Sequence, residues 1–179
     1  ILKKIDKSVL WLVNSNKWAE NNIFKQAELN NINSSRIIFA NNLPHLEHLE
    51  RHRHADIFLD TFNYNAHTTA SDALWAGLPI ITKQGSQFAA RVASSLLSAL
   101  DLNELISKTD DEYEKLIVDY ASQPEKLKEI KEKLDRNKND KPLFNTQQYT
   151  RHFELGMQRV NELYLNEEKP VDIILNQIK

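Results

Sequence analysis

The sequence has 179 residues, a formal net charge of −2 and no cysteine. This length suits one domain with a substantial core, and the near-neutral charge argues against a nucleic-acid-binding surface. Without cysteine there is no disulfide framework, thiolate nucleophile or cysteine-ligated zinc. The three glycines are too few for a glycine-rich phosphate-binding loop. No apolar run reaches membrane-spanning length and no signal-peptide pattern is visible, so we expect a cytoplasmic protein.

The N-terminal part of the chain alternates between predicted helices and strands. Residues 1–5 have the pattern of the end of a helix, and residues 8–13 are typical of a buried strand. An amphipathic helix is predicted over residues 18–30, and a second strand near residues 36–40. A proline then opens a helix predicted over residues 44–54, which is a normal position for proline.

This proline-led helix is rich in histidine. His48 and His52 are four residues apart, a spacing that can bring two metal ligands to one helix face. No nearby segment supplies an obvious third ligand, so we expect no metal site. The simpler interpretation is a solvated amphipathic helix with Leu46 and Leu49 in the core.

The stretch over residues 56–82 reads as strand, polar loop, helix and strand. Its first strand, near residues 56–60, contains a short apolar run typical of a strand buried on both faces. Small hydroxyl side chains begin the helix, Gly77 ends it, and a last strand is predicted near residues 79–82. A helix N-terminus that follows a strand can bind an anion, because free backbone N–H groups and the helix dipole face the ligand there.

The spacing at the start of this helix allows two interpretations. Thr68, Thr69 and Asp72 share one helix face. Hydroxyl and amide groups suit phosphate oxygens, and a carboxylate one turn further along suits the hydroxyls of a ribose. Alternatively, the threonines only cap the helix and Asp72 only interacts with the helix dipole.

The C-terminal half is predicted to be mainly helical. Helices are expected at residues 86–100, 109–122, 124–135 and 147–166, with a short turn or edge piece at 102–106 and a polar loop at 136–142. Strands that alternate with helices imply right-handed βαβ units and a mostly parallel sheet. Ligands of such sheets bind beyond the carboxyl ends of the strands, where Pro44, the loop 61–66 and the helix tip at His67 can converge.

Two ungapped runs resemble the C-terminal catalytic half of the O-GlcNAc transferase family, which has tetratricopeptide-repeat-linked bacterial relatives. The runs are A-D-I-F-L-D-T at residues 55–61 and N-A-H-T-T-A-S-D-A-L-W-A-G-L-P at residues 65–79. The resemblance continues through residues 90–93 and 142–146. It implies a Rossmann-like α/β fold, the C-terminal nucleotide-binding half of a GT-B glycosyltransferase. Residues 1–179 would then be one truncated UDP-sugar-binding domain, with helix 147–166 packing back towards a missing half.

The resemblance also implies roles for individual residues. The UDP-sugar site would use the diphosphate-binding His67, Thr68 and Thr69, the ribose-binding Asp72, and the uracil-contacting Leu43, His48 and Arg51. The family needs no metal or other cofactor. Its catalytic histidines and a phosphate-contacting lysine would lie outside this chain, as would a strand and a helix of the same domain. We therefore expect no catalytic residue in this chain and no activity from it alone.

The resemblance implies an enzyme that transfers N-acetylglucosamine from UDP-GlcNAc to serine or threonine of an acceptor protein. Its partners would be the N-terminal catalytic half and tetratricopeptide repeats of the full protein, with no nucleic acid or membrane. Two alternatives remain open. One is a non-catalytic nucleotide-binding or interaction module of the same fold, and the other is a related glycosyltransferase with a different sugar or acceptor.

Overall fold

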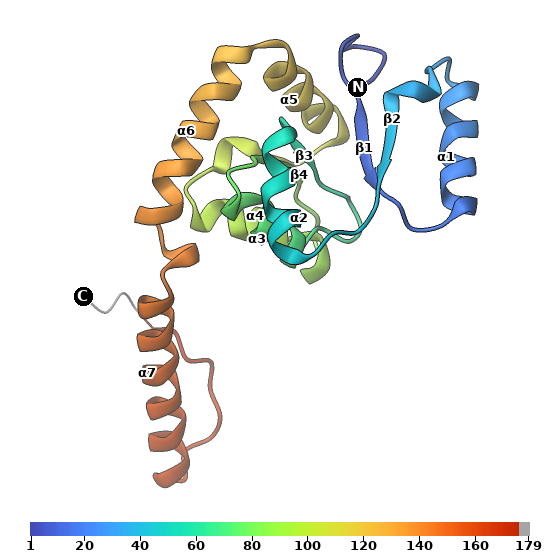
Figure 1. Cartoon of the computed structure of the whole chain (residues 1–179). Helices are drawn as coiled ribbons and strands as arrows, with labels where there is room; N and C mark the ends of the chain where they lie inside the picture. Colours follow the sequence, from blue (N-terminus) through green and yellow to red (C-terminus); the bar gives the residue numbers. More distant parts are fainter. Residues whose placement is uncertain (176–179) are drawn as a thin grey trace.

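Parallel strands connected through helices form the scaffold of the computed structural model, which describes residues 1–175 (Figure 1). β1 (Leu10–Val13) pairs in parallel with β2 (Ile37–Ala40), and α1 (Lys17–Leu29) connects them. A parallel pair needs such a crossover because its strands run in the same direction. The predicted first βαβ unit is therefore confirmed.

A second sheet contains the remaining strands in the order β3-β4-β5. These are β3 (Phe58–Leu59), β4 (Ile80–Lys83) and β5 (Ile106–Ser107), and all pairings are parallel. The expectation of mostly parallel pairing is confirmed, and within the described residues the strands form two sheets, because no ladder joins β1 to β3. Each of these two strands has only one paired edge, and β1, rather than β2, lies on the side of its sheet towards β3 (Figure 1).

The hydrophobic core surrounds β4. Ile80 and Ile81 are fully buried, as expected for a central parallel strand covered on both faces. The helices that pack around them are α3 (Thr68–Trp75), α4 (Val92–Ala99), α5 (Asp110–Ser122) and α6 (Pro124–Asp140). Their fully buried side chains include Leu74, Leu97 and Leu134. Burial of each such side chain contributes about 1.5–3 kcal/mol relative to an exposed one.

Two helix ends form as their sequences predict. Gly77 follows α3 with a φ of +85°, a left-handed conformation that favours glycine. Its N–H donates to the Leu74 carbonyl at 3.1 Å, and the Leu78 N–H donates to the Ala73 carbonyl at 2.8 Å, which together make a Schellman motif. At the start of α5, Thr109 and Glu112 form a reciprocal capping box.

The helix predicted over residues 86–100 begins later than expected. A 3₁₀ turn at Phe88–Ala90 precedes α4, so Ser86 does not cap it. The cause is a tight fold-back, in which the Gly85 N–H donates to the Ala90 carbonyl at 2.8 Å. A Cβ at Gly85 would lie 2.6 Å from that of Ala90, so glycine permits this close approach.

Two other expectations are also corrected, and that of a short turn or edge piece at residues 102–106 is confirmed. α6 continues through the predicted loop to Asp140, and within this extension the Asn137 side chain donates to the Leu100 carbonyl at 2.7 Å. The helix stops shortly before Pro142, because the residue before a proline disfavours the helical conformation. Residues 102–106 contribute a 3₁₀ turn at Asn103–Leu105 and the start of β5. Residues 1–5 form turns rather than a helix end.

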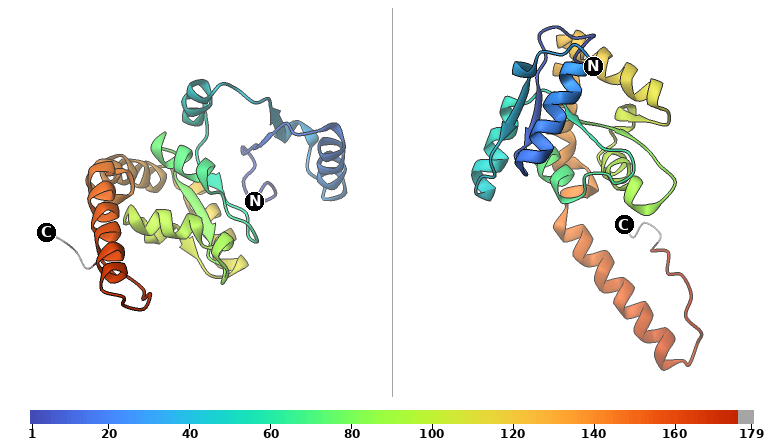
Figure 2. Two further views of the ribbon diagram at one scale, coloured as in Figure 1. Left: turned by 90° about the horizontal axis from the view of Figure 1, so that it is seen from below. Right: turned by 90° about the vertical axis from the view of Figure 1, so that its right-hand side faces the viewer.

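The helix α2 (His45–Arg51) is shorter than predicted, because a 3₁₀ turn at His52–His54 replaces its last turn. The long helix α7 (Thr146–Leu165) agrees closely with its predicted range and extends away from the sheets (Figures 1 and 2). The packing of α7 against another half stays a prediction. Within residues 1–175, no helix is long and apolar enough to cross a membrane.

Candidate functional site

The N-terminus of α3 presents unused donors. His67 is the N-cap residue but makes no side-chain cap, and Thr68 and Thr69 are the first two residues inside the helix. The N–H groups of Ala70 and Ser71 both donate to the His67 carbonyl at 3.1 Å. Among the described residues, none accepts from the N–H groups of Thr68 and Thr69. The capping interpretation is therefore wrong for both threonines, whose exposed hydroxyl and N–H groups are free to meet an anion.

Asp72 and His48 lie close enough to interact, although they belong to different helices. Burial lowers the pKa of His48, and the positive charges of His52 and Arg51 lower it further. The Asp72 carboxylate acts in the opposite direction and raises the pKa of His48. α2 and α3 therefore bring the His48 ring and the Asp72 carboxylate within electrostatic range of each other, and contact of either residue with a uracil or a ribose stays a prediction.

Arg51 holds the loop between β2 and α2. Its guanidinium donates to the Asn41 carbonyl at 2.7 Å and lies 5.5 Å from the ring centroid of Trp11. Leu43 lies on this loop and is exposed. The structure thus gives Arg51 a structural role beside Leu43, and direct contact of either residue with a base stays a prediction.

The histidines in and just after α2 form no recognisable metal centre. His52 is buried, with its Nδ1 atom 2.7 Å from the His48 carbonyl oxygen and its ring edge-to-face with that of His48. In the part of the chain that the structure describes, no group of three histidine, aspartate or glutamate side chains could hold a metal ion. His45 is exposed at the first position of the helix.

The ring of His67 is held between aromatic neighbours. It stacks on Tyr64 with the ring centroids 4.6 Å apart, and it meets Phe88 edge-on at 6.1 Å. Its Nε2 atom lies 3.4 Å from the Ala89 carbonyl oxygen. These contacts fix the imidazole at the start of α3, next to the residues with free N–H groups.

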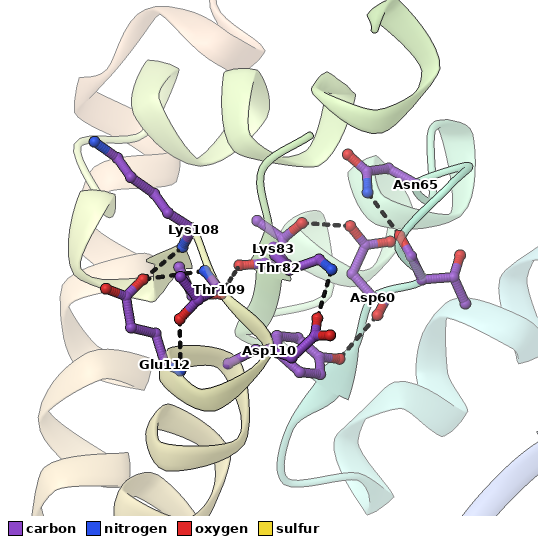
Figure 3. A network of polar contacts seen from close by, with 11 residues as sticks. Asp60, Asn65, Thr82, Lys83, Lys108, Thr109, Asp110 and Glu112 are labelled. Carbon is purple, nitrogen blue, oxygen red and sulfur yellow. Dashed lines mark hydrogen bonds and ion pairs between the residues drawn. The ribbon is translucent and has the colours of Figure 1, made fainter. Parts of the chain in front are cut away.

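Sequence reasoning missed Asp60, the polar residue with the most partners near this site (Figure 3). One carboxylate oxygen accepts from the Ala66 N–H at 2.7 Å and the other accepts from the Thr82 hydroxyl at 2.6 Å. The Tyr113 hydroxyl donates to the Asp60 backbone carbonyl at 2.8 Å. Burial raises the pKa of the Asp60 carboxyl group. The available signal was a carboxylate placed directly after a buried strand.

Asn65 fixes the same loop from within. It is only 1% exposed, its side-chain amide donates to the Thr61 carbonyl at 2.7 Å, and its N–H donates to the Ala89 carbonyl at 2.8 Å. Its side-chain oxygen is the one buried side-chain polar atom of the described residues that has no hydrogen-bond partner. Such groups are rare in native proteins and tend to occur where function constrains a loop.

Comparison with known proteins gives concordant results. The sequence model described as glycosyl transferase family 41 matches residues 1–153. A *Caenorhabditis elegans* protein named UDP-N-acetylglucosamine–peptide N-acetylglucosaminyltransferase is 34% identical over 98% of this chain and 15% of its own length. The *Arabidopsis thaliana* protein SEC, which carries the same name marked as probable, is 33% identical over 95% of this chain and 18% of its own length.

The solved structure of a *Thermobaculum terrenum* O-GlcNAc transferase mutant is also similar, with a TM-score of 0.82 and 25% sequence identity. The match covers 88% of this chain and 31% of that one. These results confirm the resemblance seen at residues 55–79 and the α/β fold of GT-B type. The chain spans less than a fifth of the length of the two curated relatives. The ligand contacts of individual residues stay predictions.

Proposed function

The chain belongs to glycosyl transferase family 41, and on that basis we propose that it forms the donor-binding half of a protein O-GlcNAc transferase. The observation that carries this proposal is the α3 N-terminus, where Thr68 and Thr69 keep free N–H groups beside His67. The half-buried Asp72 carboxylate and the His48 ring lie within electrostatic reach of each other. Together they supply what a nucleoside diphosphate needs: donors for phosphate, an acceptor for ribose and a ring for the base.

The proposed reaction breaks the bond between the sugar anomeric carbon and the diphosphate oxygen of UDP-GlcNAc. The anomeric carbon then bonds to the hydroxyl oxygen of a serine or threonine, and the hydroxyl proton passes to a base outside this chain. The N–H groups of Thr68 and Thr69 and the dipole of α3 would stabilise the negative charge on the leaving UDP. Because these groups offset that charge, we propose that UDP binding needs no metal.

The full protein would supply what this chain lacks. In the proposal, an N-terminal catalytic half brings the catalytic histidines and tetratricopeptide repeats help to select the acceptor protein. The proposed location is the cytoplasm.

Calorimetry on the intact protein tests the proposal. We expect UDP and UDP-GlcNAc to bind, and UMP to bind more weakly because it has one phosphate fewer to meet the helix tip. UDP-glucose and UDP-N-acetylgalactosamine show whether another sugar is preferred. EDTA should leave UDP affinity unchanged, and a loss restored by magnesium or manganese contradicts the metal-free part. Binding without transfer to any peptide favours a non-catalytic module, and no binding of any uridine nucleotide refutes the donor site.

A further inference from the structure

Asp60 links the sheet to the residue that immediately precedes the N-cap of α3. It follows β3, and the loop 61–66 separates it from His67. One of its carboxylate oxygens accepts from the Thr82 hydroxyl on β4 (Figure 3), and the other accepts from the Ala66 N–H. Asp60 is 4% exposed, so both hydrogen bonds are shielded from water. A single side chain thus ties the far end of the loop to the central strand.

The start of α3 depends on this link because the usual capping interaction is missing. An N-cap residue normally has an extended backbone and a side chain that accepts from the first turn. His67 instead has φ −105° and ψ −92° and makes no side-chain cap. The direction in which the chain enters α3 is therefore set from outside the helix, and the Asp60–Ala66 hydrogen bond acts one residue before the N-cap.

Other contacts hold the body of the same loop. The Phe62 ring lies edge-to-face with the Tyr113 ring, with the two centroids 5.0 Å apart. The amino group of Lys83, a residue of β4, lies 4.1 Å from the centroid of the Phe62 ring. The Asn65 side chain donates back to the Thr61 carbonyl. These contacts keep the loop folded whether or not the Ala66 N–H has its partner. Removal of that one hydrogen bond should therefore alter the helix tip more than the loop.

We propose that Asp60 is a positioning residue for the donor site, which orients the free N–H groups of Thr68 and Thr69 towards the diphosphate. This inference rests on the proposed function. Binding is tighter when donors are already oriented, because less conformational freedom is lost on association. Loss of the Asp60 carboxylate should therefore weaken recognition of the diphosphate and leave recognition of the nucleoside unchanged.

The test compares Asp60→Ala, Asp60→Asn and Thr82→Val in the intact protein, with UDP and uridine as ligands. Asp60→Ala should weaken UDP binding about tenfold, the size expected for one well-placed hydrogen bond, and change uridine binding little. Asp60→Asn should restore UDP affinity, because its amide oxygen can accept from Ala66 and its NH₂ group can donate to Thr82. Thr82→Val removes only the other hydrogen bond of the same carboxylate, so it should lower the melting temperature without loss of UDP affinity.

If Asp60→Ala does not fold, Asp60→Ser provides the same comparison. Its single hydroxyl lies nearer the backbone than either carboxylate oxygen and cannot bridge the Ala66 N–H and the Thr82 hydroxyl, so UDP binding should again fall while uridine binding does not. The inference is overturned if UDP and uridine affinities fall together, if Thr82→Val weakens UDP binding as much as Asp60→Ala does, or if neither Asp60→Ala nor Asp60→Ser affects UDP binding. Failure of the unaltered protein to bind UDP would instead refute the proposed function.

Discussion

Asp72 lies one helical turn from Thr68 and is only half-buried, so its carboxylate is available to a ligand. A carboxylate that accepts from a sugar hydroxyl contributes about 1.5–3 kcal/mol. We expect Asp72→Asn in the intact protein to weaken UDP binding by about tenfold or more, since each ~1.4 kcal/mol is a factor of ten. Calorimetry with UDP measures this change.

The alternative role of Asp72 predicts a different result. If it only favours the helix dipole, the substitution should cost about 0.3–1 kcal/mol of stability and leave UDP affinity nearly intact. Asp111→Asn is a control for a pure dipole effect, because Asp111 is an exposed acidic residue in the first turn of α5, whereas Asp72 lies just past the first turn of α3. It should reproduce a small loss of melting temperature without any effect on UDP. Asp72→Asn with unchanged UDP binding would remove Asp72 from the site.

The proximity of His48 and Asp72 gives a second prediction. Burial, His52 and Arg51 hold the pKa of His48 below 6.5, while Asp72 partly opposes them. Asp72→Asn should therefore lower the pKa of His48 further. A pH titration of the imidazole signals by NMR measures both values. A His48 pKa at or above 6.5, or one that does not respond to Asp72→Asn, would mean that the two side chains are not placed as described.

The lowered pKa of His48 also makes the stability of the folded protein depend on pH. Because the folded-state pKa of His48 is depressed, its stabilising contribution is present above the unfolded value of about 6.5. That contribution is lost as the pH falls through the lower folded-state pKa. Denaturation curves between neutral and mildly acidic pH should therefore show a loss of stability that His48→Gln reduces.

At the scale of single elements, Gly77 offers a sharp test of how α3 ends. Its φ of +85° is unfavourable for any residue with a Cβ, although a Cβ there would meet no atom within 4 Å. Gly77→Ala should therefore destabilise the protein through its backbone alone, by about 1–2 kcal/mol. Chemical denaturation measures the change.

Gly156 provides the matched control because it lies inside α7, where a Cβ would make only an ordinary contact 3.7 Å from Leu175. Gly156→Ala should stabilise the protein by about 0.5–1 kcal/mol, because glycine is the poorer helix former. Opposite signs for the two substitutions are expected. If Gly77→Ala were neutral, the left-handed helix end would be wrong.

Local patterns predicted the elements well where the determining residues are neighbours in sequence. The glycine end of α3 and the capping box of Thr109 and Glu112 depend on residues within a few positions of each other. The start of α4 was misplaced because the approach of Gly85 to Ala90 is a matter of packing. Asp60 was overlooked as a site residue for a related reason, since its partners Thr82 and Tyr113 are distant in sequence.

At the scale of the whole molecule, the two sheets leave the backbone N–H and C=O groups along two strand edges without hydrogen-bond partners in the described residues. β1 and β3 each have an unpaired edge within the described residues, and such an edge can pair with a further strand. One further parallel strand between them would satisfy both edges and give the strand order of a doubly wound sheet. The sequence could not reveal that the strands divide into two sheets, because the hydropathy pattern of a strand does not show which other strand it pairs with.

The helix α7 carries an exposed apolar stripe. Its side chains follow the three- and four-residue spacing of one helix face, and all are about half exposed or more: Tyr149, Phe153, Met157, Val160 and Tyr164. The spacing identified the helix and its apolar face correctly. Because α7 extends away from the sheets, this face is available to cover another part of the protein, as the donor-half proposal requires (Figure 2).

The last prediction concerns activity of residues 1–179 on their own. In the proposal, this chain orients only the donor, whereas rapid transfer requires the acceptor hydroxyl and its base to be held beside the sugar. The purified chain, supplied with UDP-GlcNAc and a set of acceptor peptides, should therefore release no UDP and glycosylate no peptide. The intact protein is the positive control, and its Asp72→Asn variant should be slowed at low donor concentration. Sustained turnover by the isolated chain would show that catalytic groups lie within it, and the assignment of a purely donor-binding half would be abandoned.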